Sequence, residues 1–362
     1  MKPIKTLLNE KLTRPDWINI SPRDAAFLWL DKNENLDSAY IDFIKKEVIA
    51  KNVGSIDLST YPELGLLYND LAVMEGVNPQ QLLLTTGSDG AIRTVFQSFV
   101  EQGSKVFISN PSFAMYDIYC KIFGADTRYI DYKRDNGIVS LDVDSLVKQI
   151  RSESPVLVCL PNPDSPTGTV LPEKDLLNIY QACKDVDAVF FVDEAYYPFH
   201  DFTMANHINE TKGENLIICR TFSKAWGMAG VRVGHLISHR NTIALMNKIR
   251  PMYEIGALAM KIAHAVISYH DKMRESVAVI KKGKNYFEYC MRDLGFETLE
   301  SHGNFSHVAL AGHKEAIFKK LDTFVYYRKD FPHPSLQGFT RFSAAPKAVM
   351  EKVVDAIKNT IK

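Results

Sequence analysis

Short apolar runs alternate with helix-like patterns along the first two-thirds of the chain. Seven of these runs have the length and residue content of buried strands, and polar segments with helical periodicity separate them. The predicted strands are Leu82–Thr85, Lys105–Ser109, Thr127–Asp131, Val156–Leu160, Ala188–Val192, Asn215–Cys219 and Val233–Ser238. Apolar strands that alternate with helices predict an α/β fold, in which a mainly parallel sheet is covered on both faces.

A different pattern flanks this region on both sides. Residues 1–36 predict an irregular arm, and an amphipathic helix follows over Asp37–Asn52, with Asp37 or Ser38 as its N-cap. A long helical pattern begins at about Ala257 and ends at about Leu294. Shorter elements come after it: strands Asn304–Leu310, Thr323–Arg328 and Phe339–Phe342, and helices Lys314–Leu321 and Pro346–Ile361.

These patterns divide the chain into three parts. We predict an N-terminal arm and helix over residues 1–53, and a large domain over residues 54–256 that holds the sheet. A connecting helix and a small α+β domain occupy residues 257–362, and we expect the arm to complete this small domain.

The composition indicates a globular chain without an unusual partner. The 362 residues are 46% hydrophobic, and 43 basic residues balance 43 acidic ones, so nothing indicates a surface for nucleic acid or anionic membranes. No metal is expected, since neither the histidines nor the cysteines have ligand spacing. Buried, reduced thiols are expected at Cys120, Cys159, Cys183, Cys219 and Cys290. The N-terminus has no apolar signal region and no run has membrane-spanning length, so we expect a cytoplasmic protein.

The segment Arg220–Arg232 is the most informative part of the chain. Lys224 lies among small residues, directly after a predicted strand. Ser223 before it and Arg232 eight residues later offer a hydroxyl and a guanidinium to a phosphate group. The amine of Lys224 can then condense with an aldehyde carried by the same phosphorylated molecule. These are the requirements of a covalently held pyridoxal 5′-phosphate (PLP).

Three other motifs follow predicted strands and support this interpretation. Asp193 ends an apolar strand, with Tyr196 three residues later; a PLP site needs a carboxylate at the pyridine nitrogen. The turn Thr85–Gly90 precedes a helical pattern, so it predicts an anion site at a helix N-terminus. The segment Pro161–Gly168 forms a further turn. Because ligands of α/β sheets bind beyond the carboxyl ends of the strands, all four motifs predict one crevice.

Together these motifs resemble the fold-type I PLP-dependent aminotransferases, and among them the histidinol-phosphate aminotransferase family. The resemblance extends from Asn33 to Arg341. It implies the PLP-dependent transferase fold: a large domain with a mostly parallel seven-stranded sheet, and a smaller α+β domain.

The resemblance assigns cofactor contacts residue by residue. Lys224 becomes the catalytic lysine, and Asp193 the partner of the pyridine nitrogen. The phosphate is assigned to Gly87, Ser88, Asp89, Ser223 and Arg232, the ring face to Phe113, and the phenolic oxygen to Tyr196 and Asn162. The family usually has asparagine where this chain has Ser165, so Ser165 remains the alternative to Asn162. It more often has glutamate where this chain has Gly90.

The resemblance also implies substrate contacts and a partner subunit. Arg341 matches the arginine that binds the substrate α-carboxylate, and Arg328 matches the arginine for a distal phosphate, although Arg328 could equally be solvated. Asn304 matches a substrate-side asparagine. Tyr61 matches a tyrosine that reaches the cofactor phosphate of a neighbouring subunit, which implies a homodimer.

The implied activity is amino transfer between an amine, either an amino acid or an amino alcohol phosphate resembling histidinol phosphate, and a 2-oxo acid such as 2-oxoglutarate. Lys224 would be the general base. Decarboxylation of a phosphorylated amino acid, as in threonine-phosphate decarboxylases, requires the same motifs and remains the alternative. A PLP-binding protein without turnover is a third possibility. The arm Asp31–Ser38 lacks the Pro-aromatic-Gly sequence of the family, so the amine stays open.

Overall fold

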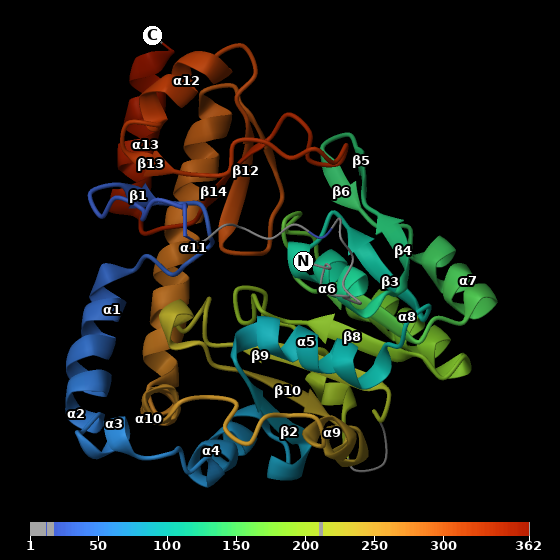
Figure 1. The fold of residues 1–362 in the computed structure, drawn as a ribbon. Helices are drawn as coiled ribbons and strands as arrows, with labels where there is room; N and C mark the ends of the chain where they lie inside the picture. Colours follow the sequence, from blue (N-terminus) through green and yellow to red (C-terminus); the bar gives the residue numbers. More distant parts are fainter. Residues whose placement is uncertain (1–11, 13–17, 210–212, 362) are drawn as a thin grey trace, which may run out of the picture.

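The computed structural model describes residue 12 and residues 18–209 and 213–361. Most of the chain forms a domain around a seven-stranded sheet with the order β2-β10-β9-β8-β7-β3-β4 (Figure 1). Only β10 runs antiparallel to its neighbours, and the other pairs are parallel. The strands are β2 Leu82–Thr85, β3 Lys105–Asn110, β4 Asp126–Asp131, β7 Leu157–Pro161, β8 Val189–Asp193, β9 Leu216–Thr221 and β10 Gly234–Ser238. The prediction of a mostly parallel, seven-stranded sheet is confirmed.

Apolar clusters cover both faces of this sheet. Consecutive strand residues point to opposite faces, so Phe190 belongs to one cluster and Phe191 to the other. On the Phe191 side lie α5 Gly87–Phe99, α6 Ala114–Phe123 and α9 Arg240–Asn247. On the Phe190 side lie α4 Gly65–Glu75, α7 Val143–Glu153, α8 Glu173–Asp185, α10 Ala257–Ile267 and part of α11 His270–Asp293. With both faces covered, a ligand can reach the sheet only at its ends.

The helix predicted over Asp37–Asn52 is a continuous helical segment with a π-helical middle. It consists of α1 Ser38–Phe43, η1 Ile44–Ile49 and α2 Ala50–Asn52. Asp37 is the N-cap, since its carboxylate accepts a hydrogen bond from the Tyr40 amide at 3.3 Å. The long helix predicted from Ala257 is instead two helices, because the chain turns at Ser268 and Tyr269 between α10 and α11.

A smaller domain follows, and α11 runs alongside it (Figure 1). Its antiparallel sheet has the order β11-β12-β14. Strand β1 of the arm pairs in parallel with β13, which confirms that the arm completes this domain. The elements are β1 Leu28–Trp29, β11 Glu297–Leu299, β12 Phe305–Ala309, β13 Val325–Tyr326, β14 Thr340–Ser343, α12 Lys314–Leu321 and α13 Lys347–Thr360.

Several short elements were not predicted from the sequence. The hairpin of β5 Lys133–Asp135 and β6 Ile138–Ser140 turns through Asn136 and Gly137, both with positive φ. The others are α3 Ile56–Ser59 and the 3₁₀ turns η2 Pro79–Gln81, η3 Met204–His207 and η4 Ala229–Val231. Among the described residues, no helix is both long and apolar enough to cross a bilayer.

Candidate active site

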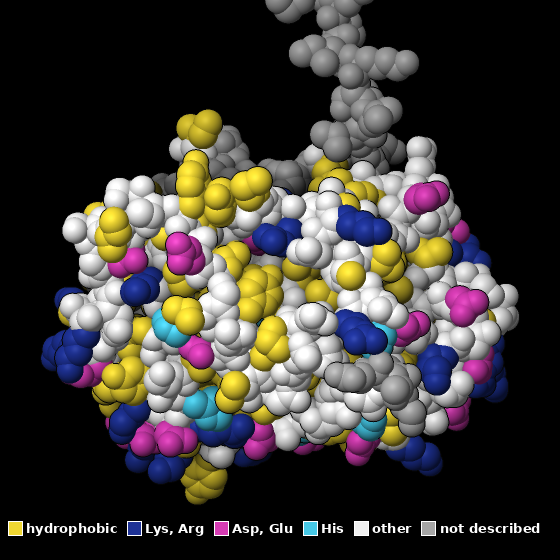
Figure 2. Space-filling view, turned by 90° about the horizontal axis from the view of Figure 1, so that it is seen from below, with side chains coloured by type: hydrophobic (Ala, Val, Ile, Leu, Met, Phe, Trp, Pro, Cys, Tyr) yellow, Lys and Arg dark blue, Asp and Glu magenta, His cyan; other side chains and the backbone are white. Residues whose placement is uncertain are grey.

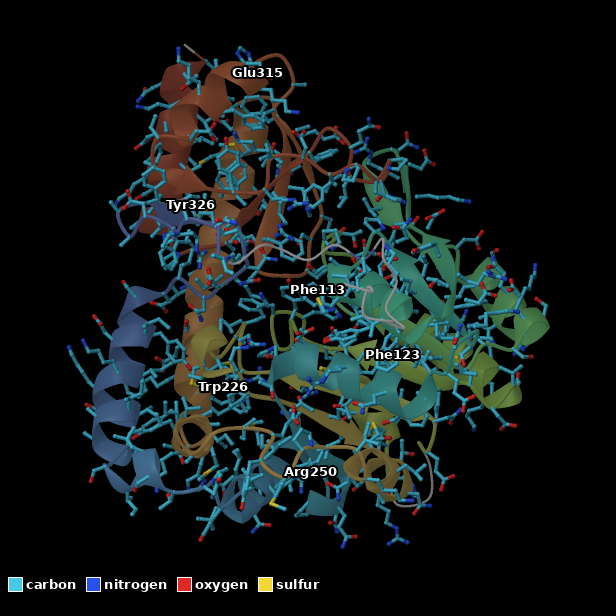
Figure 3. The ribbon with its side chains drawn as sticks, in the orientation of Figure 1. Phe113, Phe123, Trp226, Arg250, Glu315 and Tyr326 are labelled. Carbon is cyan, nitrogen blue, oxygen red and sulfur yellow. The ribbon has the colours of Figure 1, made fainter. Side chains whose placement is uncertain are left out.

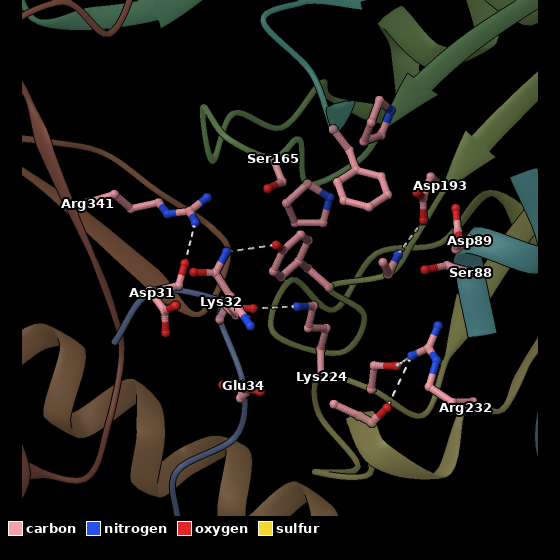
Figure 4. Close-up of a pocket in the computed structure, with 18 residues that line it drawn as sticks. Asp31, Lys32, Glu34, Ser88, Asp89, Ser165, Asp193, Lys224, Arg232 and Arg341 are labelled. Carbon is pink, nitrogen blue, oxygen red and sulfur yellow. Dashed lines mark hydrogen bonds between the residues drawn. The ribbon is translucent and has the colours of Figure 1, made fainter. Parts of the chain in front are cut away.

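A cavity of about 430 Å³ lies where the strand ends of the large domain face the arm and the small domain (Figure 4). It brings together nine of the residues singled out in the sequence. These are Ser88, Asp89, Phe113, Asp193, Tyr196, Ser223, Lys224, Arg232 and Arg341. The four strand-end motifs therefore meet in one crevice, as their positions after strands predict.

Lys224 follows the end of β9 and points into this cavity (Figure 4). Its Nζ donates a hydrogen bond to the Lys32 carbonyl at 2.8 Å, and lies 5.9 Å from the centre of the Tyr196 ring. Within the described part of the chain it forms no ion pair. The amine is thus held by a single backbone oxygen and is available for covalent chemistry.

The start of helix α5 and the residues around Lys224 build an anion site. Helix α5 begins at Gly87, where φ is +69°, and Ser88 and Asp89 of its first turn line the cavity. The Arg232 Nη1 donates to the Ser223 hydroxyl at 3.2 Å. A Cβ atom at Gly87 would lie 2.5 Å from Arg232 Nη2, so only glycine lets the guanidinium reach the helix start. Helix dipole and guanidinium together favour a phosphate.

Asp193 ends β8 as a buried carboxylate, on the same side of Lys224 as Ser88 and Asp89 (Figure 4). The Tyr116 hydroxyl donates to its Oδ2 at 2.9 Å, and the Ala195 amide donates to its Oδ1 at 3.0 Å. Burial raises the pKa of Asp193 to about 6, although both hydrogen bonds lower it. A cation such as a protonated pyridine nitrogen would stabilise this carboxylate. Sequence reasoning missed Tyr116, which lies three residues after Phe113 on α6.

The residues that line the cavity have the chemical groups that PLP requires. The cavity offers a free amine, a buried carboxylate, an aromatic wall and an anion site whose Arg232 has no ion-pair partner within the described residues. Phe113, 42% exposed, lies at the edge of the large domain that faces the small one (Figure 3). Lys224, Asp193, Phe113 and the Ser223–Arg232 pair would therefore hold the cofactor.

Asn33 of the arm links both domains at the cavity. It adopts a left-handed conformation with φ 56°. Its Nδ2 donates to the Tyr196 hydroxyl at 2.9 Å, and its amide donates to the Ser343 hydroxyl at 2.8 Å. The Asn33 carbonyl accepts from Asn304 Nδ2 at 3.0 Å. Asn304 is fully buried and does not line the cavity, so it holds the arm where a substrate contact was expected.

The two arginines expected to bind substrate lie side by side but differ in access. Arg341 lines the cavity, and its Nη2 donates to the Asp31 carbonyl at 2.9 Å. Burial lowers the pKa of Arg341, and the nearby charge of Arg328 acts in the same direction. Arg328 pairs with Arg341 through the backbone, while its exposed guanidinium stacks over Phe331 and does not line the cavity.

Three residues assigned to the cofactor do not line this cavity: Gly87, which lies beside Arg232 at the start of α5, Asn162 and Tyr61. Asn162 is buried, and its Oδ1 accepts from the Leu171 amide at 2.8 Å. The wall is formed instead by Ser165, the residue at the family's asparagine position (Figure 4). Tyr61 is 72% exposed and stacks on Tyr253 with ring centres 4.2 Å apart. It therefore makes no contribution to the cavity of its own chain.

The cavity carries an excess of unpaired positive charge. The acids of the arm are ion-paired, because Arg23 Nη1 lies 2.9 Å from both Asp31 and Glu34. Four lining cations form no ion pair with any described residue: Lys32, Lys224, Arg232 and Arg341. Lys32 lies on the same side as Arg341 (Figure 4). This excess favours a ligand set with several negative groups.

Comparison with known proteins agrees with this geometry. The family model described as aminotransferase class I and II matches residues 25–357. The chain is 31% identical over 290 residues to the histidinol-phosphate aminotransferase of Ruminiclostridium cellulolyticum, covering 79% of each chain. It is 28% identical over 340 residues to that of Caldanaerobacter subterraneus subsp. tengcongensis, covering 90% of this chain and 92% of the relative.

Solved structures share the fold. The histidinol-phosphate aminotransferase from Sinorhizobium meliloti, solved in complex with PLP, superposes with a TM-score of 0.79 at 23% identity, over 93% of this chain and 91% of that one. An L-threonine-O-3-phosphate decarboxylase from Porphyromonas gingivalis has a TM-score of 0.74 at 20% identity, over 92% and 99%. The cavity chemistry and the family match together lead to one conclusion: this chain belongs to the aminotransferase class I and II family and is a PLP-dependent aminotransferase.

Proposed function

We propose that this aminotransferase moves an amino group between an amine that carries an anionic group distal to its nitrogen, such as an amino alcohol phosphate like histidinol phosphate, and 2-oxoglutarate. The observation that carries the proposal is the pair of unpaired cations, Lys32 and Arg341, on the wall opposite Asp193. The names of the two relatives support an amino alcohol phosphate.

The residues of the large domain serve the cofactor. When bound, PLP supplies an electron sink for the bond that breaks at the substrate Cα. Lys224 would hold the cofactor through its aldehyde, and its free amine would move the proton between Cα and the cofactor C4′. Asp193 would keep the pyridine nitrogen protonated, and Tyr196 and Ser165, which both line the cavity, would contact the phenolic oxygen. Ser223, Arg232 and the first turn of α5 bind the phosphate.

Arg341 binds the carboxylate of the 2-oxo acid. Its guanidinium presents two parallel donors, which match a carboxylate. Burial lowers the pKa of Arg341, and a bound carboxylate would raise this pKa again. By holding this carboxylate, the same arginine would fix the carbonyl carbon of the 2-oxo acid near Lys224, and water would leave the site as the substrate fills the cavity.

The distal anion has two candidate ligands. Arg328 holds the position that the family resemblance assigns, and Lys32 lines the cavity. The test compares Arg328→Ala and Lys32→Ala with the wild type on a phosphorylated amine and its dephosphorylated analogue. The variant that loses the preference for the phosphorylated amine identifies the ligand. If the wild type has no such preference, the proposed amine class is wrong, while the cofactor chemistry is unaffected.

Tyr61 is proposed to complete the site of a second copy of the chain. Tyr61 stacks on Tyr253, and further exposed hydrophobic side chains lie on α3, on α4 and in the segment before α10: Ile56, Leu58, Leu66 and Met252. The face seen from below in Figure 2 shows hydrophobic side chains among charged ones. We expect a dimer in sedimentation experiments, and we expect Tyr61→Ala to weaken PLP binding without changing the cavity of its own chain.

Transamination is tested by the form of the cofactor after one turnover. We expect an amine panel to convert enzyme-bound PLP to pyridoxamine phosphate, and 2-oxoglutarate to restore it. The decarboxylase alternative, which the neighbour from Porphyromonas gingivalis keeps open, predicts carbon dioxide release from a phosphorylated amino acid without pyridoxamine phosphate. The absence of both products would favour a binding protein without turnover.

A further inference from the structure

Glu254 is a buried carboxylate that contacts the start of the phosphate-binding helix from behind. It lies between α9 and α10, and its side chain is 3% exposed. Its Oε1 accepts hydrogen bonds from the Thr86 hydroxyl at 2.8 Å and from the Thr86 amide at 3.3 Å. Arg93 lies 3.7 Å from the same oxygen. Glu254 does not line the cavity, so it contacts neither the cofactor nor the substrate directly.

Thr86 is the N-cap of α5, but it does not cap the helix. Its hydroxyl donates to Glu254 Oε1 and to the Glu254 carbonyl, and forms no hydrogen bond to the first turn. Thr203 shows the usual behaviour at η3, where its hydroxyl accepts from the Ala205 amide at 2.9 Å. A threonine at an N-cap ordinarily satisfies one of the free amides in this way. At α5 the hydroxyl is engaged elsewhere.

The remaining polar group of Thr86 points toward the anion site. Its carbonyl accepts from Arg232 Nη2 at 3.4 Å, so Glu254, Thr86 and Arg232 form one chain of hydrogen bonds. Gly90 leaves room for this arrangement. A Cβ atom there would lie 3.3 Å from the Thr86 Cβ and 3.4 Å from Glu254 Oε1.

We propose that Glu254 is a positioning residue that keeps the Thr86 hydroxyl away from the start of α5. The amides of the first helical turn then have no side-chain cap and remain available to the cofactor phosphate. In the absence of Glu254, the Thr86 hydroxyl rotates and caps the helix, and the phosphate must compete with it. The proposal concerns the cofactor site alone and does not depend on which amine the enzyme uses.

The experiment is a double-mutant cycle of Glu254→Ala and Thr86→Val on the cofactor-free protein. Dissociation constants are measured for PLP and for pyridoxal, which lacks the phosphate. We expect Glu254→Ala to weaken PLP binding about fivefold, the equivalent of one helix-cap hydrogen bond of about 1 kcal/mol, and to leave pyridoxal binding unchanged. The double variant should recover most of the PLP affinity, because valine cannot cap.

Three results would overturn the proposal. Equal weakening of PLP and pyridoxal would indicate general disruption of the fold. Failure of Thr86→Val to restore PLP affinity in the Glu254→Ala background would show that the hydroxyl does not compete. Selective weakening of PLP binding by Thr86→Val alone would show that the hydroxyl itself binds phosphate. This measurement remains decisive if the Glu254→Ala variant does not fold. Glu254→Gln is the conservative control, since its amide oxygen accepts the same bonds and should keep PLP affinity.

Discussion

The two walls of the cavity are held together in different ways. On the large-domain wall, key contacts join residues close in sequence: Asp193 to Ala195, two residues apart, and Ser223 to Arg232, nine apart. On the opposite wall, Asn33 bonds to Tyr196 across 163 residues, and Arg341 to Asp31 across 310. The first wall is built from neighbouring strand ends of one domain, whereas the second exists only when arm, sheet and small domain assemble.

We therefore expect the two walls to have different functions: the large-domain wall supports the reaction, and the opposite wall binds the substrate. Changes on the large-domain wall should abolish the reaction in a protein that remains folded. Changes on the opposite wall should alter substrate affinity and the seating of the arm, while the cofactor stays bound.

The largest effect is expected for Lys224→Ala. Without its amine, no group in the cavity can hold the aldehyde covalently or carry the proton from Cα. We expect turnover to fall by more than about 10⁴-fold, with PLP still bound noncovalently. Steady-state kinetics and the absorbance spectrum of the bound cofactor measure the two effects. Lys32→Ala is the matched control, because it removes a cavity cation but should leave the bound-cofactor spectrum unchanged.

Asp193→Asn should come next, since it removes the charge that keeps the pyridine nitrogen protonated. Asparagine can still accept from the Ala195 amide and donate to the Tyr116 oxygen, so the local structure should survive. We expect a loss of about 10³-fold in turnover, equivalent to about 4 kcal/mol of barrier. Near-normal turnover would exclude the electron-sink role.

The same variant should have the opposite effect on the stability of the cofactor-free protein. The folded pKa of Asp193, about 6, lies above its ordinary value of 3.8, so the proton favours the folded state. This contribution is fully present below pH 3.8 and is lost as the pH rises through 6. Asp193→Asn should therefore be more stable than the wild type at pH 8, by at most about 3 kcal/mol, and similar at pH 3.5. Denaturant unfolding at both pH values checks this.

On the opposite wall, Arg341→Ala should act on substrate affinity. It removes a guanidinium that would pair with a carboxylate, and such charge-assisted contacts contribute about 2–3 kcal/mol. We expect KM for 2-oxoglutarate to rise by about 100-fold, with PLP affinity unchanged. Weaker PLP binding in this variant would contradict the separation of the two walls.

The smallest effect, on stability, is expected at Asn33. Two substitutions there separate the contribution of the left-handed backbone conformation from that of the side-chain hydrogen bond. Asn33→Gly keeps access to the left-handed conformation but loses the bond to Tyr196. Asn33→Ala also adds backbone strain of about 1 kcal/mol. Asn33→Ala should therefore be the less stable of the two in thermal unfolding, and equal stability would show that the positive φ is not costly here.

The same contrast explains what the sequence could predict. Lys224, Asp193 and Arg232 could be predicted to lie in one cavity because each lies in a short motif after an apolar strand, and strand ends of a parallel sheet converge. Asn33 and Lys32 were not assigned, since their roles depend on partners hundreds of residues away. Asn304 was placed with the substrate because a motif gives residue identity but not the direction of a side chain. The break between α10 and α11 was missed because its helical pattern continues across the turn.

The central claim is that Lys224 holds PLP in an aminotransferase site, and reduction with borohydride tests it most directly. The protein is incubated with PLP, reduced, digested and analysed by mass spectrometry, with Lys224→Ala treated in parallel. We expect one pyridoxyl-modified peptide, with the label on Lys224, and no labelled peptide from the variant. A label on another lysine, or equal labelling of the variant, would contradict it.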